Sequence, residues 1–291
     1  MEENKISLKE KCKSYQERVN YYLDPEKWII VHIDGKNFSS LIKNNFHKPF
    51  DEDFVQMMDN TAKYLCQEVQ GVRFAYVQSD EISLALKKNT PKSDIFFGGR
   101  LCKLQSIIAG MASSFFTKEM IIYNLRYTDI NFNDYLEIAK NSDVYQFDCK
   151  AWNVDDANDA MAWFLFRNID CIRNSKQQAA QAYLSHKQLL GKTADEQIEL
   201  LKSSQNINWN NYFDGWKYGR ILEKDNVEMV FDGKSFVRSI WKVKDGCNLT
   251  VSENRNKLFE KHFQENISGL KLSDENLPNW NDNYIWKQME L

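Results

Sequence analysis

Residues 72–87 read VRFAYVQSDEISLALK, and this stretch decides the fold. The run before Gln78 is mostly apolar, and after Glu81 large apolar residues alternate with smaller or polar ones. Alternation with a period of two indicates a β-strand with one face toward a core. The stretch therefore predicts a β-hairpin with the tetrapeptide QSDE, residues 78–81, at or near its turn.

Upstream of this hairpin the pattern predicts a strand and two helices. Residues 28–33, WIIVHI, form a mostly apolar run that ends at the turn pair Asp34-Gly35, which is typical of a buried strand. Residues 51–69 carry apolar side chains at helical spacing and acidic ones in the first turn, where they favour the helix dipole. A more polar helix is expected over residues 5–22.

Downstream, residues 94–118 predict a long helix, and one further strand near 143–149 completes the order βαββαβ. This is the ferredoxin-like plan, so the expected fold class is α+β. Further helices are expected over 156–184 and 194–205. The last third is rich in tryptophan and suggests short strands and loops. We therefore expect two domains, a catalytic one over 1–205 and an appended aromatic-rich lobe over 206–291.

The composition of the chain excludes several classes of protein. With 291 residues and a net charge of −3, it is not a polybasic nucleic-acid binder, so any RNA contact needs a local basic patch. Six cysteines without C-x-x-C spacing argue against a zinc site or a disulfide framework, and we expect reduced thiols in the cytoplasm. No signal peptide and no membrane-spanning run is expected.

Three acidic residues carry the predicted chemistry. Asp34 ends the first strand, and Asp80 and Glu81 occupy the hairpin turn, so in a ferredoxin-like sheet these ends lie side by side. Converging carboxylates suit Mg²⁺, which also takes ligands from substrate phosphates. Two such ions can activate a hydroxyl and stabilise a leaving pyrophosphate. Either piece alone is more often a solvated turn, and only the combination favours a metal site.

The same residues carry a family resemblance. HIDGKNF at 32–38, Lys48-Pro49 with Asp51, and FAYVQSDEISLALKK at 74–88 resemble the core of tRNA-histidine guanylyltransferase and its relatives. That family has a polymerase-palm fold and adds nucleotides to the 5′ end of tRNA in the 3′-to-5′ direction. The resemblance extends over roughly residues 28–205.

The resemblance implies roles for individual residues. Asp34 and Asp80 would coordinate two Mg²⁺ ions, Gly35 would offer its carbonyl oxygen, and Glu81 would be a third essential acid. GTP and ATP would be the nucleotides, and the family suggests a homotetramer. The expected nucleotide-binding residues are Asp34, Gly35, Lys36, Asn37, Phe38, Ser39, Lys48, Asp51, Ser79, Asp80, Arg100 and Lys103.

One motif differs from the sequence found in the guanylyltransferases proper. In them an Asp-Cys pair is followed by His-Ile-Asn-Asn, whereas here Asp170-Cys171 is followed by IRNS at 172–175. This form resembles the guanylyltransferase-like proteins that repair truncated tRNA 5′ ends against a template. The residues expected to contact RNA or a second triphosphate are Arg173, Asn174, His186 and Lys187.

Several functions remain open at this stage. The favoured one is templated 3′-to-5′ addition of nucleotides to truncated tRNA. The alternatives are tRNA-histidine guanylyltransferase proper, a nucleotide cyclase with a related palm and a similar pair of aspartates, and a non-catalytic RNA-binding module. The cyclase alone predicts a cyclic nucleotide product with no RNA present.

Overall fold

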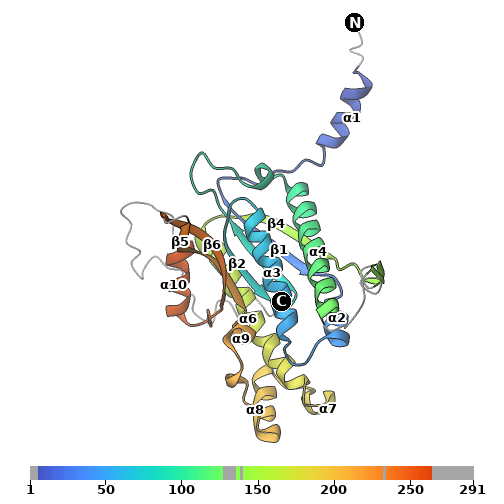
Figure 1. Cartoon of the computed structure of the whole chain (residues 1–291), viewed down its shortest axis with the longest axis vertical. Helices are drawn as coiled ribbons and strands as arrows, with labels where there is room; N and C mark the ends of the chain where they lie inside the picture. The colour runs from blue at the N-terminus through green and yellow to red at the C-terminus, as the bar shows by residue number, and fades with distance from the viewer. Residues whose placement is uncertain (1–5, 127–135, 138–139, 232–233, 264–291) are drawn as a thin grey trace.

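The computed structural model describes residues 6–126, 136–137, 140–231 and 234–263. Its centre is a six-stranded antiparallel sheet in the order β4-β1-β3-β2-β5-β6 (Figure 1). The strands are β1 (Trp28–Gly35), β2 (Val72–Gln78), β3 (Glu81–Leu86), β4 (Phe147–Val154), β5 (Arg220–Phe231) and β6 (Lys234–Asp245). The first four strands have the ferredoxin-like order, which confirms the predicted α+β palm core.

Helices cover the sheet and extend beyond it. They are α1 (Leu8–Glu17), α2 (Phe38–Asn45), α3 (Glu52–Glu68), α4 (Leu101–Arg126), α6 (Ala157–Gln181), α7 (His186–Leu189), α8 (Ala194–Gln205), α9 (Asp214–Tyr218) and α10 (Ser252–His262). Helix α1 projects away from the rest of the molecule, whereas α7 and α8 lie at the opposite end (Figure 1). No side chain of α1 is buried. None of the described helices is both long and apolar enough to cross a membrane.

The two faces of β1 explain why its sequence is apolar almost throughout. Ile29, Val31 and Ile33 belong to the core formed with α3 and α4. Trp28 and Ile30 belong to a second core on the other face, formed with α6 and α10. Since helices cover both faces, each successive residue of the strand is buried and the alternation expected of a half-exposed strand is lost.

Several predicted boundaries were displaced. The helix expected over 94–118 begins at Leu101, because Phe97 and Gly98 have left-handed backbone conformations that a helix cannot contain. It then continues to Arg126. The strand expected near 143–149 is β4, four residues later. Helices α2, α7, α9 and α10 were not predicted.

The last third of the chain differs from its prediction. Instead of short strands and loops, β5 and β6 are twelve residues each and pair along their full length. The edge of β2 pairs with β5, so this hairpin continues the central sheet. The division into domains at 205/206 stays a prediction. Trp280 and Trp286, which contributed to the expected aromatic lobe, lie outside the described residues.

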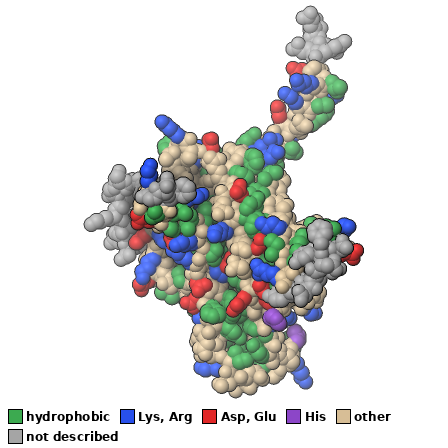
Figure 2. Space-filling view, viewed as in Figure 1, with side chains coloured by type: hydrophobic (Ala, Val, Ile, Leu, Met, Phe, Trp, Pro, Cys, Tyr) green, Lys and Arg blue, Asp and Glu red, His purple; other side chains and the backbone are tan. Residues whose placement is uncertain are grey.

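The visible surface agrees with the near-neutral net charge. In Figure 2, acidic and basic side chains are interspersed over the face shown, without a large area of one sign. On this face an RNA contact would therefore depend on individual basic residues rather than on a broad positive field.

Candidate active site

The structure brings the three predicted acids together at one end of the central strands. Strand β2 ends at Gln78 and β3 begins at Glu81, so Ser79 and Asp80 form a two-residue turn, with a positive φ of 45° at Ser79. Asp34 of β1 is paired in register with Glu81. The backbone N–H of Gly35 donates to the Asp80 carbonyl at 3.2 Å, which joins the two strand ends directly.

Two of these carboxyl groups have raised pKa values. Burial, followed by the charges of Glu81 and Asp148, raises the pKa of Asp34. Burial raises the pKa of Asp80 to about 6, although hydrogen bonds from its own backbone and from Ser79 oppose the shift. Within the described part of the chain, neither Asp34 nor Asp80 has an ion pair. The site thus concentrates negative charge, which the charges of Lys150 and Arg167 offset only in part at Asp34.

This donor set fits a metal ion that shares its ligands with a substrate. The described residues include no group of three or more His, Cys, Asp and Glu side chains arranged to hold an ion. Mg²⁺ does not need such a cage, because it binds through one or two carboxylates and completes its shell with water and phosphate oxygens. Asp34 and Asp80 offer carboxylates of this kind, at the open end of a sheet.

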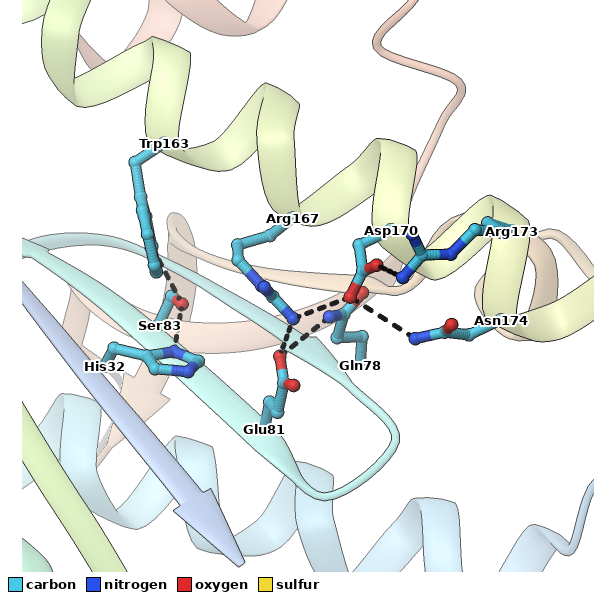
Figure 3. A network of polar contacts seen from close by, with 9 residues as sticks. All are labelled: His32, Gln78, Glu81, Ser83, Trp163, Arg167, Asp170, Arg173 and Asn174. Atoms are coloured by element: carbon cyan, nitrogen blue, oxygen red, sulfur yellow. Dashed lines mark hydrogen bonds and ion pairs between the residues drawn. The ribbon is translucent and has the colours of Figure 1, made fainter. Parts of the chain in front are cut away.

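Glu81 has a different environment from the two aspartates. Its Oε2 accepts hydrogen bonds from Nη2 of Arg167 and, at 2.7 Å, from Nε2 of Gln78 (Figure 3). Arg167 comes from α6, and only 8% of its surface is exposed. The sequence analysis did not identify either Arg167 or Gln78. Arg167 was detectable only as a basic residue three positions before Asp170 on a helix, which is a weak signal.

The network continues along α6 to two predicted RNA-binding residues. Arg167 also donates to Asp170 at 3.0 Å, and Asp170 accepts from Arg173 and, at 3.3 Å, from Asn174. The four α6 side chains and Glu81 form one connected set in Figure 3. Arg173 and Asn174 therefore lie within the same polar network as the acidic turn. Asp148, which faces Asp34 from β4, is a further acid that the sequence analysis missed.

A helix N-terminus lies a few residues after Asp34, where α2 begins. Asn37 has a left-handed conformation and precedes α2, whose first turn has no side-chain cap. Phe38 is 1% exposed and packs against Phe116 and Phe147, so its side chain belongs to the core. A Cβ on residue 35 would lie 2.6 Å from the Phe38 ring, which explains the glycine. Lys36 donates to Gln146 and Ser39 is exposed.

The remaining predicted site residues are spread more widely. Asp51 caps α3, accepting from the backbone of His47 and Phe54, and Lys48 beside it is exposed. Arg100 directly precedes α4 and Lys103 is in its first turn. Arg100 pairs with Tyr22, in the segment that leads into β1, so within one chain both residues lie at the opposite end of that strand from Asp34. His186 and Lys187 are exposed on α7, at the end of the molecule occupied by α8 (Figure 1).

A cleft opens beside the acidic turn. It encloses about 650 Å³ of empty space, including its open mouth. One wall is formed by Gln78, Ser79 and residues of α6, and the other by the rings of Phe50 and Trp216, which stack with their centroids 5.2 Å apart. A cleft with apolar rings and a few polar groups is typical of a small-molecule site.

Comparisons with known proteins agree with the resemblance seen in the sequence. A family model described as tRNAHis guanylyltransferase matches residues 9–155. An uncharacterized protein of Acanthamoeba polyphaga mimivirus is 28% identical over 91% of this chain and 94% of its own. The tRNA(His) guanylyltransferase of Kluyveromyces lactis is 28% identical over 71% of this chain and 86% of its own. A bacterial tRNA(His) guanylyltransferase-like protein, solved in complex with ATP, superposes with a TM-score of 0.74 at 27% identity, covering 89% of this chain and all of that one.

Proposed function

Because the chain belongs to the tRNA-histidine guanylyltransferase family, we propose that it adds nucleotides to the 5′ end of tRNA in the 3′-to-5′ direction. Templated repair of truncated ends is the main reaction in this proposal. One observation carries it: Asp34 and Asp80 meet at adjoining strand ends with raised pKa values and no ion pair within the described residues. Acids without an ion pair of their own suit divalent cations bound together with phosphates.

Two Mg²⁺ ions are the proposed cofactors. When bound, they would supply activation of the attacking hydroxyl and stabilisation of the leaving pyrophosphate. Asp34 and Asp80 would hold them, with the Gly35 carbonyl oxygen as a further ligand. Glu81 has a separate role in this proposal: Arg167 and Gln78 hold its side chain, and it supports the geometry of the turn.

The triphosphate of GTP or ATP would lie against the start of α2. Backbone N–H groups in the first turn of a helix bind phosphate oxygens well. The first turn of α2 directly follows the acidic strand end and lacks a side-chain cap, which supports this position. Ser79 and the exposed Lys48 would contribute a hydroxyl and a point charge. For Arg100 and Lys103 to take part, they would have to come from another subunit of the proposed homotetramer.

The RNA would approach along α6. Arg173 is 55% exposed at its side chain, and its guanidinium is well shaped for bidentate phosphate recognition. Its link through Asp170 to Arg167 and Glu81 supports a position near the 5′ end of the RNA. His186 and Lys187 would contact more distant parts of the tRNA. The IRNS sequence at 172–175 favours templated repair over strict recognition of tRNA-histidine.

The decisive experiment supplies the protein with Mg²⁺, all four nucleoside triphosphates and tRNAs trimmed at the 5′ end. Sequencing both ends of the products identifies which end grows and whether the added base complements the opposite strand. Growth at the 5′ end with complementary bases is expected. Formation of a cyclic nucleotide without RNA would instead favour the cyclase, and the absence of any product would favour a binding module.

A further inference from the structure

One buried arginine is shared between the acidic turn and the helix that carries two predicted RNA contacts. Nη2 of Arg167 donates both to Oε2 of Glu81 and, at 3.0 Å, to Oδ2 of Asp170 (Figure 3). Only 9% of the Arg167 side chain is exposed, and its Nε has no hydrogen-bond partner among the described residues. A single guanidinium nitrogen therefore carries the ion pairs to both carboxylates.

Asp170 has a second cation, which is accessible from outside. Its Oδ1 accepts from Arg173, whereas its Oδ2 accepts from Arg167 and, at 3.3 Å, from Asn174. Spacings of three and four residues place these side chains on neighbouring turns of α6, within reach of one another. The Arg173 side chain is 55% exposed. An RNA phosphate can thus reach Arg173, while Arg167 stays enclosed.

The charge of Glu81 acts on both aspartates of the turn. Burial is the largest cause of the raised pKa at Asp34 and at Asp80, and the charge of Glu81 raises both pKa values further. The charge of Arg167 lowers the pKa of Asp34. The strength of the pair between Arg167 and Glu81 therefore determines how much negative charge is felt where divalent cations are proposed to bind.

The two pairs of Arg167 compete with each other. Because both use the same nitrogen, a closer approach to one carboxylate weakens the attraction to the other. While Arg173 contacts Asp170, it neutralises part of the charge of that carboxylate. A phosphate that draws Arg173 away would leave more of this charge for Arg167. Arg167 would then shift toward Asp170 and leave Glu81 more negative.

We propose that Arg167 is a positioning residue that couples RNA binding at Arg173 to cation binding at the acidic turn. RNA phosphate on Arg173 raises the affinity of the turn for divalent cations, and a bound cation raises the affinity for RNA by the same factor. The inference rests on the proposed function and adds a control to it: the turn binds its cations most tightly when an RNA end is present.

The full chain without RNA gives the first test, with Mn²⁺ as a paramagnetic probe of the cation site. Arg173→Gln takes the second cation from Asp170, as a phosphate would, so we expect Mn²⁺ to bind about fivefold more tightly than to wild type. Titrations followed by electron paramagnetic resonance measure the free Mn²⁺. Asp80→Ala shows how much Mn²⁺ binds elsewhere on the chain.

A matched control removes a different cation of the same helix. Lys176 also belongs to α6, but it pairs with Asp195 rather than with Asp170. Lys176→Gln should change the Mn²⁺ affinity by less than about twofold, because a charge outside the network acts only through screened space. An equal gain in Lys176→Gln and Arg173→Gln would overturn the inference.

A double-mutant cycle separates the network from a through-space effect of Arg173. In Arg167→Met, the further change Arg173→Gln should leave the Mn²⁺ affinity unchanged, because no shared guanidinium remains. Removing a buried partner can unfold a protein, so Asp170→Asn, which keeps the size of the side chain, is the second background. A fivefold gain that persists in either folded background contradicts the coupling, and so does the absence of a gain in the otherwise wild-type chain.

Binding of trimmed tRNA tests the reciprocal effect. Filter binding with and without Mn²⁺ should show that Mn²⁺ strengthens RNA binding to wild type about fivefold more than to Arg167→Met. Any effect of Mn²⁺ on the RNA itself is common to both proteins and cancels in this ratio. Equal effects of Mn²⁺ on the two proteins would overturn the proposal.

Failure of the inference can be told apart from failure of the proposed function. A protein without coupling that binds Mn²⁺ through Asp80 and extends trimmed tRNA retains the proposed function and loses the role of Arg167. Mn²⁺ binding that Asp80→Ala leaves unchanged removes the cation site from the turn, and both proposals fail.

Discussion

Two buried carboxylates at different places in the sheet have opposite electrostatic environments. At the turn between β2 and β3, burial raises the pKa of Asp80 to about 6. In β5, burial also acts to raise the pKa of Glu223, but hydrogen bonds from Lys244 and Lys261 and the charge of His262 outweigh it and hold the pKa at about 2. The Glu223 side chain is 3% exposed and is within 2.7 Å of the His262 Nε2.

The difference separates a structural acid from one with a proposed functional role. Glu223 joins β6 and α10 to the sheet, because its cations come from both elements. Asp80 does not join two elements in this way, and no cation among the described residues forms an ion pair with its buried carboxylate. Buried charge of this kind is common at sites that bind a charged partner, so the comparison supports the proposal that the acidic turn binds cations.

The largest expected effect is on catalysis. Asp34→Ala and Asp80→Ala should each reduce kcat/KM for nucleotide addition at least about a hundredfold, because a lost metal ligand weakens stabilisation of the leaving pyrophosphate. Asp148→Asn is a matched control, since Asp148 faces Asp34 but is not a proposed ligand. Steady-state kinetics at saturating Mg²⁺ measure both. Near-wild-type turnover of either alanine variant would remove the acidic turn from the mechanism.

A second effect concerns stability without metal. The folded-state pKa of Asp80 lies above its usual value of 3.8, so ionisation destabilises the fold, and stability is lost as the pH rises from about 4 through about 6. Asp80→Asn should therefore stabilise the metal-free protein by about 2 kcal/mol at pH 7 and hardly at all below pH 4. Urea denaturation in EDTA across this range measures the difference. An Asp80→Asn variant less stable than wild type at pH 7 contradicts the comparison.

Glu223→Gln should change the free energy of unfolding in the opposite direction and destabilise the protein. It leaves Lys244, Lys261 and the His262 imidazole without their shared carboxylate, but the two lysines are about half exposed, so we expect a loss of about 1–2 kcal/mol at pH 7. The folded-state pKa lies below the usual 4.5, so the loss should be complete above pH 5 and should vanish as the pH falls toward 2. Urea denaturation at several pH values tests this, with Glu253→Gln, an exposed pair on α10, as the control.

The smallest effect is expected at Arg173, which contacts Asp170 from an exposed position. Arg173→Ala should change stability by less than about 0.5 kcal/mol, as for other exposed ion pairs. If Arg173 binds RNA phosphate, kcat/KM for RNA should nevertheless fall about fivefold, and Arg173→Lys should not restore it because lysine lacks the planar fork. A change of less than twofold in both variants would make Arg173 a surface residue.

Local patterns were sufficient to predict the hairpin that carries the acidic turn. The apolar run before QSDE and the alternation after it predict a turn there, and Asp34-Gly35 marks the end of a strand, so the meeting of Asp34 with Asp80 followed once the ferredoxin-like order was recognised. These signals lie within a few residues of each other. They depend on backbone periodicity, which a sequence displays directly.

Other parts of the site depended on contacts between distant segments. Phe38 is in a motif that predicts nucleotide binding, yet its ring is buried because α4 and β4 pack over it. Arg167 reaches Glu81 across 86 positions of sequence, and Asp148 faces Asp34 only through the register of β4 with β1. No periodicity encodes such pairs, since they follow from how α6 and β4 pack against the sheet.

The sequence by itself determined the palm-like core and the acidic turn, because hydrophobic periodicity and turn chemistry are local properties of the chain. It indicated the family through the resemblance of its motifs at 32–38 and 74–88. Only the tertiary structure decided that β5 and β6 extend the sheet and that Glu81 is held by Arg167 and Gln78. The physical reason is that burial and hydrogen-bond pairing belong to the packed molecule. A residue's neighbours in space then outweigh its neighbours in sequence.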